Sequence, residues 1–303
     1  MTTWITRMVR VGLAAIVSAC TPGIQPGGPV AVPPSLCDQW FTTRDGMALP
    51  VRSWQPETEP PRAVLLALHG FNDYSNAFNT AGPFLAKQGI LVYAYDQRGF
   101  GRAPYPGLWP GTQRLIDDLH DIAQAIRQRH PGIPLHLLGD SMGGAVVMVA
   151  STSPTPPPHD GLILVAPAVW GRSTMPWPHR IALFLTAHTM PWLKLSGRGL
   201  RIVPSDNIEM LRSLSRDPLV IKETRTDTVH GLADLMDEAV AAAKRLGGPT
   251  LLLYGARDEV VPENAMAEAI RSLPPAPTVA VYEEGYHMLL RDLKASVPLG
   301  DIA

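Results

Sequence analysis

The sequence predicts an α/β fold, in which helices cover both faces of a mostly parallel sheet. Short apolar runs recur along the chain, segments of helical periodicity separate them, and one run leads through a glycine-flanked serine into a helical stretch. Continuous apolar runs are typical of strands that are buried on both faces of a parallel sheet. The alternation of strand and helix then places the protein in the α/β class.

The expected strands follow one another at regular intervals along the chain. Residues 40–56 are expected to form an antiparallel hairpin that turns at Asp45-Gly46 and adds two edge strands. The clearest helix is expected over residues 111–130, where apolar side chains recur at spacings of three and four. The apolar runs expected to form the other strands are 63–70, 90–96, 135–139, 161–167, 249–255 and 277–283.

Length, composition and charge narrow the possible functions. A chain of 303 residues, 46% of them hydrophobic, can bury a large core. The 26 Lys and Arg residues balance the 27 Asp and Glu residues, so the protein has no electrostatic field that would attract a polyanion. Nucleic acid is therefore not expected as a partner.

The first twenty residues have the layout of an export signal. Arg7 and Arg10 precede an apolar run over 11–17, and small residues then lead to Cys20. This "VSAC" ending resembles a bacterial lipobox, which implies a lipoprotein-type signal peptide over 1–20, lipidation of Cys20 and attachment to the bacterial cell envelope. The alternatives are an ordinary signal that is cleaved nearby, or a start codon assigned too early.

Residues 21–36 are rich in proline and glycine and lack periodicity, so they are expected to form a tether. The folded domain is expected over 37–303. If Cys20 carries lipid, Cys37 has no intramolecular partner, because the chain contains only these two cysteines. If it does not, a disulfide between Cys20 and Cys37 is possible in an oxidising compartment.

The stretch "LHLLGDSMGGAVVMVA" (135–150) contains the candidate nucleophile. Its "GDSMG" segment matches Gly-x-Ser-x-Gly, the pattern of a nucleophile elbow between a strand and a helix. The serine of such an elbow has a strained backbone, and glycines two positions away let strand and helix approach closely. The short pattern is weak evidence in a chain with 26 glycines, but the expected strand and helix around it make it specific for Ser141.

A serine nucleophile needs a base, and the base needs an orienting acid. Of the nine histidines, only His287 directly follows the last expected strand. Asp258 follows the preceding strand, which gives the chain order Ser, Asp, His. Glu259 is the alternative acid, although Asp258 lies nearer the strand end.

Two backbone N–H groups are expected to form an oxyanion hole for the negative charge of the tetrahedral intermediate. One belongs to Met142, directly after the nucleophile, and the other to Phe71, in the loop after the strand at 63–70. His69 is expected to have a structural role beneath that loop. Asp140 is expected to lie behind the nucleophile and not to act as a second base.

Together, the motifs "LHGF", "YDQRGFG", "LLGDSMGGA", "LYGARDEVVP" and "GYHMLLRD" resemble the monoacylglycerol lipase and lysophospholipase branch of the α/β-hydrolase family. The resemblance covers most of residues 38–303. It implies an eight-stranded, mostly parallel sheet with a lid inserted after strand six. It assigns the nucleophile to Ser141, the acid to Asp258, the base to His287 and the oxyanion donors to Phe71 and Met142.

The sequence departs from this family pattern at two places. Many members have histidine before the nucleophile, where this chain has Asp140, so the finer substrate preference does not carry over. The ending "KASVPLGDIA" is short, so the final helix is expected to be short or truncated.

About eighty residues separate the strands at 161–167 and 249–255, too many for a simple crossover, so an inserted cap is expected over about 168–247. The first part of the cap is rich in apolar residues. These residues are expected either to form an acyl-chain pocket and contact a membrane, or only to pack the cap onto the body. A later cap helix is expected to be capped by Ser205 or Asp206. The apolar residues of the first part are Trp177, Ile181, Phe184, Leu185, Met190, Trp192 and Leu195.

The resulting hypothesis is a lipid-anchored serine ester hydrolase. It would cleave monoacylglycerols, lysophospholipids or similar small lipid esters through an acyl-enzyme, without a metal or organic cofactor. A proline iminopeptidase-like peptidase or an acyltransferase would use the same triad. A lipid-binding surface lipoprotein without turnover is the alternative from a different class, and a fluorophosphonate probe would leave its Ser141 unmodified.

Overall fold

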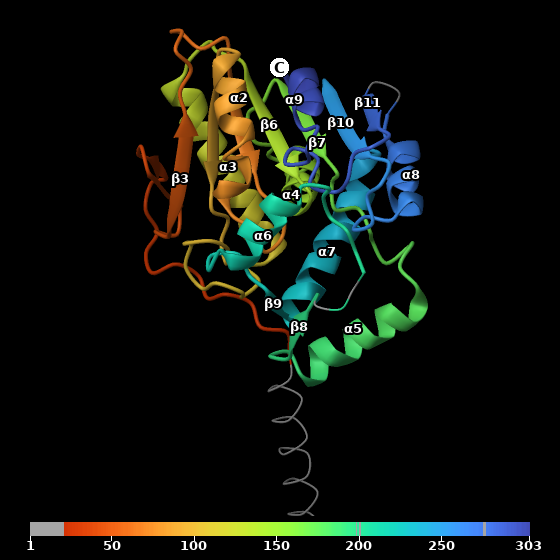
Figure 1. Cartoon of the computed structure of the whole chain (residues 1–303). Coiled ribbons are helices and arrows are strands. Elements are labelled where there is room, and N and C mark those ends of the chain that lie inside the picture. Colours follow the sequence, from red (N-terminus) through yellow and green to blue (C-terminus); the bar gives the residue numbers. More distant parts are fainter. Residues whose placement is uncertain (1–20, 198, 200, 275–276) are drawn as a thin grey trace, which may run out of the picture.

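The computed structural model describes residues 21–303 apart from 198, 200, 275 and 276. Cys20 and the expected signal peptide thus lie outside the described residues. The chain forms a nine-stranded sheet in the order β1-β2-β3-β5-β4-β6-β7-β10-β11, with helices on both faces (Figure 1). The predicted α/β class and mostly parallel sheet are confirmed.

Six neighbouring strands of the sheet are paired in parallel. Each falls within a predicted strand, except that β6 runs one residue past the predicted 135–139. Their carboxyl ends therefore meet at one edge of the sheet, which is where side chains of an α/β active site gather. These strands are β4 (Ala63–Leu68), β5 (Ile90–Tyr95), β6 (Leu135–Asp140), β7 (Gly161–Val165), β10 (Thr250–Gly255) and β11 (Thr278–Tyr282).

The predicted hairpin completes the expected eight strands. Strands β2 (Trp40–Thr42) and β3 (Ala48–Trp54) are antiparallel, and Gly46 in their turn has a φ of 77°, which glycine adopts readily. The antiparallel pairing of β3 with β5 joins the hairpin to the parallel strands. The ninth strand, β1 (Ser35–Leu36), is a two-residue addition at the end of the expected tether.

Helices cover the two faces of the sheet with separate apolar cores. One core contains α3 (Thr112–Arg129), α4 (Met142–Ser151), α7 (Thr226–Ala243) and α8 (Glu263–Ser272). The opposite core contains η1 (Ser75–Phe78), α2 (Ala81–Lys87) and the short final helix α9 (Ser296–Ile302). Helix α7 belongs to the predicted cap range, yet its buried residues are part of the main core.

Among the described residues, the other elements of the insertion add no buried hydrophobic side chain to either core, although Leu183 packs against the core that contains α7. These elements are α5 (Trp177–Thr189), β8 (Lys194–Ser196), α6 (Ile208–Arg216) and β9 (Glu223–Arg225), and β8 and β9 form a separate antiparallel pair. Figure 1 shows α5 at one end of the molecule. None of the described helices combines the length and hydropathy needed to span a membrane.

The start of α6 differs from the prediction. Asn207 caps this helix by accepting the N–H of Met210, at 3.1 Å, so the expected cap at Ser205 or Asp206 is wrong. The hydroxyl of Ser205 instead donates to Asp292, and the carboxylate of Asp206 accepts the N–H of Leu293. Both side chains are thus engaged by the segment before α9.

The expected tether contacts the domain at several points. Gly23 donates its N–H to Asp227 at the start of α7, and Gly28 donates to Asp45 in the β2–β3 turn. Gln25 is buried and donates its backbone N–H to the carbonyl of Trp109. Cys37, at the beginning of the expected domain, is an exposed free thiol.

Candidate active site

Ser141 occupies a strained turn between β6 and α4. Its φ of 50° and ψ of −112° are unfavourable for a residue with a side chain, as expected for a nucleophile elbow. The surrounding structure holds this conformation, because the N–H of Ser141 donates to Val165 and its carbonyl accepts the N–H of Ala168, both at 2.9 Å. The turn presents the serine hydroxyl at the carboxyl edge of the sheet.

The glycines around Ser141 are required by close backbone approach. A Cβ at Gly139 would lie 2.4 Å from the carbonyl oxygen of Gly143, and a Cβ at Gly143 would lie 2.2 Å from that of Leu68. A Cβ at Gly144 would lie 2.9 Å from the ring of Pro167. These distances are too short for any side chain, so the Gly-x-Ser-x-Gly-Gly sequence permits the contact of strand and helix.

Three predicted side chains converge at this edge. The Nε2 atom of His287 lies 3.0 Å from Oγ of Ser141, and its Nδ1 atom lies 2.8 Å from Oδ2 of Asp258. His287 and Asp258 are buried, and the remaining oxygen of Asp258 accepts the N–H groups of Val260 and Val261. The carboxylate is therefore fixed in a position that orients the imidazole.

The surroundings of His287 favour its charged form. Burial lowers the pKa of the imidazole, but the hydrogen bond and negative charge of Asp258 outweigh this effect, so the pKa is raised above its usual value. With Asp258 accepting the Nδ1 proton, Nε2 is free to accept a proton from Ser141. This arrangement is that of a general base beside an activatable hydroxyl.

Glu259, the alternative acid, points elsewhere. Its Oε2 atom accepts the N–H of Val203 in the insertion, at 2.7 Å. The structure therefore places Asp258, and not Glu259, against His287.

The two expected oxyanion donors lie close to Ser141. A Cβ at Gly70 would be 3.3 Å from the Cβ of Ser141, which places the loop with Phe71 beside the nucleophile. Met142 is the first residue of α4, where N–H groups have no partner within the helix. Within the described residues, the N–H of Phe71 also forms no backbone hydrogen bond. Both groups can therefore donate to a developing oxyanion.

His69 supports this loop from below. It is fully buried, and its Nε2 accepts the N–H of Gln97 at 3.0 Å while its Nδ1 donates to the carbonyl of Gly70 at 2.8 Å. Burial lowers the pKa of the ring, which keeps it neutral. These contacts are those of a structural residue.

Arg291 and Asp73, which form an ion pair near the triad beside the expected Asp140, were not identified from the sequence. Arg291 forms an ion pair with Asp73 at 2.7 Å, and both side chains are largely buried. Asp140 is also buried, and burial raises its pKa to about 6 although Arg291 and His287 lower it. The position of Arg291, four residues after His287, is the sequence signal that could have identified it. Across the described ranges, no cluster of three or more His, Cys, Asp or Glu side chains could hold a metal ion.

Comparison with known proteins places this geometry in a family. The chain is 27% identical to rat monoglyceride lipase over 254 residues, which is 82% of each chain. It is 25% identical to a monoacylglycerol lipase of Mycolicibacterium smegmatis over 278 residues, covering 86% of this chain and 94% of that protein.

Solved structures share the fold at lower identity. A monoacylglycerol lipase of Paleococcus ferrophilus has 22% identity and a TM-score of 0.67, covering 84% of this chain and 96% of that one. A soluble variant of the Saccharomyces cerevisiae monoglyceride lipase has 18% identity and a TM-score of 0.68, covering 92% and 95%. These matches confirm the predicted α/β-hydrolase fold.

A family profile identifies the family. The profile described as serine aminopeptidase S33 matches residues 59–294, which include all three converging side chains and both expected oxyanion donors. Because this match covers most of the chain, the protein belongs to the serine aminopeptidase S33 family of α/β-hydrolases, as its monoacylglycerol lipase-like motifs predict.

Proposed function

We propose that this protein is a serine ester hydrolase that cleaves monoacylglycerols, with Ser141 as nucleophile, His287 as base and Asp258 as orienting acid. The observation that carries the proposal is the position of His287, hydrogen-bonded to both partners at 3.0 and 2.8 Å. The relatives named monoglyceride and monoacylglycerol lipases support the substrate class.

The reaction proceeds in two halves. Oγ of Ser141 attacks the ester carbonyl carbon while its proton passes to Nε2 of His287, and Asp258 stabilises the imidazolium. The tetrahedral intermediate collapses, the bond to the alcohol oxygen breaks, and the imidazolium gives its proton to the departing glycerol. Water, deprotonated by the same imidazole, then attacks the acyl-enzyme, releases the fatty acid and restores the serine hydroxyl.

Negative charge on the carbonyl oxygen is stabilised by the N–H groups of Phe71 and Met142. Both donors are backbone groups, so they need no reorganisation as charge develops. Because Met142 is the first residue of α4, the positive end of the helix dipole also stabilises this negative charge.

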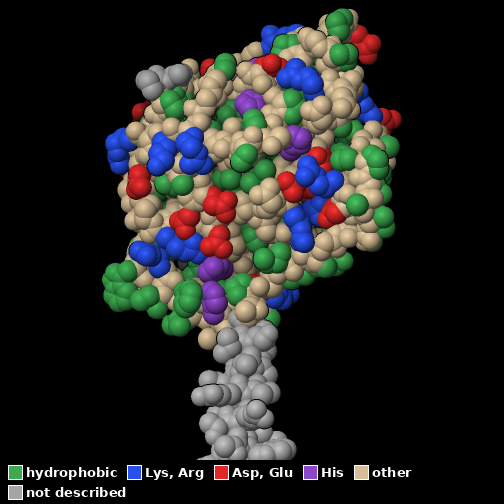
Figure 2. All heavy atoms as spheres, turned by 180° about the vertical axis from the view of Figure 1, so that it is seen from behind, with side chains coloured by type: hydrophobic (Ala, Val, Ile, Leu, Met, Phe, Trp, Pro, Cys, Tyr) green, Lys and Arg blue, Asp and Glu red, His purple; other side chains and the backbone are tan. Residues whose placement is uncertain are grey.

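The exposed face of α5 supports contact with a lipid surface. Hydrophobic side chains gather over α5 at the lower left of Figure 2. Their exposure argues against the alternative in which they only pack the cap onto the body, because packed side chains would be buried. The exposed residues on α5 are Trp177, Ile181, Phe184 and Leu185, and those in the segment directly after it are Met190, Trp192 and Leu195.

Lipid anchoring remains part of the proposal, on the sequence signal at Cys20. The residues that follow Cys20 lie near the insertion. Gly23 donates its N–H to Asp227 in the first turn of α7, and α5 packs against α7. An acyl chain on Cys20 would therefore bring the apolar face of α5 towards the same bilayer. Attachment of an exported protein to the bacterial cell envelope, and lysophospholipids as further substrates, belong to the same proposal.

The test combines covalent labelling with a substrate panel. A fluorophosphonate probe should label the wild type and leave Ser141→Ala unlabelled, and Ser141→Ala should lose roughly 10⁴- to 10⁶-fold in kcat on p-nitrophenyl esters. Ser151→Ala, at the end of α4, is the matched control and should keep both properties. Monoacylglycerols, lysophospholipids and aminoacyl amides are then compared by kcat/KM.

The panel separates the competing functions. Preference for aminoacyl amides would favour a peptidase, and acyl transfer to an added alcohol in place of water would favour an acyltransferase. Full ester hydrolysis by Ser141→Ala would refute the proposed function, as would a wild type that is neither labelled nor active.

A further inference from the structure

The loop that carries Phe71 is a tight turn whose shape sets the direction of its N–H groups. Asp73 donates its N–H to the carbonyl of Gly70, at 3.3 Å, so Phe71 and Asn72 are the two central residues of the turn. Asn72 has a φ of 64°, in the left-handed region that asparagine tolerates better than most residues. The N–H of Phe71 is thus aimed by a turn that depends on the conformation of Asn72.

Asn72 is held by the insertion and not by the body of the domain. Its Nδ2 donates to the hydroxyl of Thr224 in β9, at 2.7 Å, and its carbonyl accepts the N–H of Ile221, at 3.0 Å. Its Oδ1 is buried and has no hydrogen-bond partner among the described residues. The link to Thr224 is therefore the one side-chain hydrogen bond that the structure gives to this amide.

Tyr74 makes a second link to the same part of the insertion. The phenol is buried and donates to Oδ2 of Asp217, at 2.7 Å, and the other oxygen of that carboxylate accepts the N–H of Leu219, at 2.9 Å. Burial and the hydrogen bond to Asp217 raise the pKa of the phenol, so it is a protonated donor at neutral pH. Residues 217–224 thus contact the turn through both Asn72 and Tyr74.

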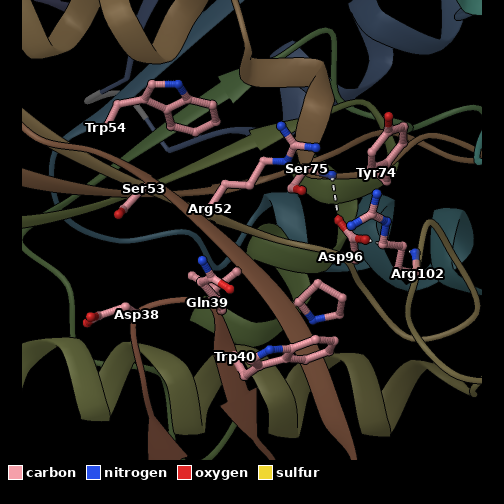
Figure 3. A pocket seen from close by; sticks show the side chains of 12 residues that line it. Asp38, Gln39, Trp40, Arg52, Ser53, Trp54, Tyr74, Ser75, Asp96 and Arg102 are labelled. Carbon is pink, nitrogen blue, oxygen red and sulfur yellow. Dashed lines mark hydrogen bonds between the residues drawn. The ribbon is translucent and has the colours of Figure 1, made fainter.

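The body of the domain holds the neighbouring residues of this loop. Asp73 is paired with Arg291 at 2.7 Å, and the carbonyl of Gly70 accepts Nδ1–H of His69 at 2.8 Å. Ser75 donates its N–H to Asp96, at 3.0 Å, at the wall of a groove of about 540 Å³ in which Tyr74 and Arg52 also lie (Figure 3). The guanidinium of Arg52 lies 5.8 Å from the centre of the Tyr74 ring. The loop is therefore fixed to the body at residues 70, 73 and 75, whereas the side chains of Asn72 and Tyr74 are fixed to the insertion.

We propose that Asn72 and Tyr74 are positioning residues that make the oxyanion donor at Phe71 depend on where residues 217–224 of the insertion lie. This inference rests on the proposed esterase function and adds a role for the insertion in the chemical step. A donor contributes fully only within about 2.7–3.1 Å of the oxyanion, so a small displacement of the turn weakens catalysis. Movement of residues 217–224 away from the body would displace the N–H of Phe71 from the oxyanion. Return of these residues would restore the hydrogen bond.

The main test removes the Thr224 hydroxyl. Thr224→Val keeps the side-chain shape but removes the partner of Asn72, and Asn72→Gly removes the amide while allowing a positive φ. On p-nitrophenyl butyrate, each variant should lose roughly 10- to 100-fold in kcat with KM within about 2-fold, somewhat less than the loss of a whole donor. Tyr74→Phe should act in the same direction.

A transition-state analogue distinguishes positioning from a general structural effect. A trifluoromethyl ketone forms a tetrahedral adduct with an oxyanion, so its affinity should fall by the same factor as kcat/KM. Thr224→Ser, which keeps the hydroxyl, should recover both. The control Thr228→Val removes another buried hydroxyl of the insertion, one that donates to the carbonyl of Gly107, and should leave kcat unchanged.

The experiment can overturn the positioning role of Asn72 and Tyr74 without overturning the proposed esterase function. An active wild type whose Thr224→Val and Tyr74→Phe variants keep kcat/KM and inhibitor affinity within about 2-fold would overturn the inference but not the esterase. A loss of kcat without loss of inhibitor affinity would also overturn it. If Thr224→Val does not fold, as judged by circular dichroism, Asn72→Gly and Tyr74→Phe decide by the same criteria.

Discussion

The imidazole of His287 lies 3.0 Å from the hydroxyl of Ser141, although 146 positions separate the two residues in the chain. Ser141 follows β6 and His287 follows β11, and these strands are parallel members of one sheet. Their carboxyl ends consequently lie at the same edge. The contact is therefore a direct product of the topology, and the chemistry that it permits leads to the following predictions.

The pH dependence of the reaction should report the raised pKa of His287. The imidazole accepts a proton only when it is neutral, so kcat/KM should fall as the pH falls through its pKa. Because Asp258 raises that pKa, the midpoint should lie above the value of about 6.5 for a free imidazole. A pH profile of kcat/KM on a neutral ester measures this midpoint, and a value well below 6 would contradict the described environment of His287.

Asp140→Asn should move the same midpoint to lower pH. The negative charge of Asp140 raises the pKa of His287, whereas Arg291 lowers it, and the neighbouring carboxylates of Asp73 and Asp258 stay unchanged in the variant. Removing one negative charge therefore makes the imidazole easier to deprotonate. The check is a pair of pH profiles recorded under identical conditions. Activity at pH 8 should stay within about 10-fold of the wild type, since Asp140 does not contact the reacting atoms.

Gly143→Ala should prevent normal folding. The new methyl group would lie 2.2 Å from the carbonyl oxygen of Leu68, where neither backbone segment can move away. Urea unfolding should show a loss of about 3 kcal/mol or more, or the protein should be insoluble. Gly247→Ala is the control, because no atom lies within 4 Å of its added methyl, and its stability should stay within about 0.5 kcal/mol.

The double variant Phe184→Ser/Leu185→Gln should weaken binding to lipid vesicles. Both side chains are more than half exposed on α5, and each would contribute about 1–2 kcal/mol on entering an apolar environment. Vesicle co-sedimentation should therefore show a loss of roughly 10- to 100-fold, with little change in hydrolysis of p-nitrophenyl butyrate. Val281→Ser, a comparably exposed residue on β11, serves as the control. Equal losses in both proteins would argue against a specific lipid-binding face on α5.

Arg98→Met should destabilise the body of the domain away from the active site. The guanidinium is 2% exposed and forms two-point contacts with Asp118 in α3 and with Asp45 in the β2–β3 turn. Its removal leaves the buried Asp118 without its partner, so the free energy of unfolding should fall by about 3–5 kcal/mol in urea. Arg212→Met is the control. It breaks an exposed ion pair with Glu209 and should change the free energy of unfolding by less than about 1 kcal/mol.

The sequence alone was sufficient for eight of the nine strands of the sheet and for the three converging side chains. Buried parallel strands need apolar residues on both faces, so each central strand appeared as an uninterrupted apolar run. The glycines around Ser141 marked a contact in which no side chain fits, and such a contact is a local property of the chain. Asp258 and His287 could be chosen from their positions after particular strands, because parallel topology fixes where strand ends meet.

Only the tertiary structure decided how the insertion contacts the catalytic loop. Asn72 and Thr224 are 152 positions apart, and nothing in the residues around either one indicates the other as a partner. Likewise, Asn207 caps α6, whereas the hydroxyl of Ser205 donates to Asp292, 87 positions away. Local patterns record the needs of a strand, a helix or a turn, whereas hydrogen bonds between distant polar side chains depend on the packing of the whole chain.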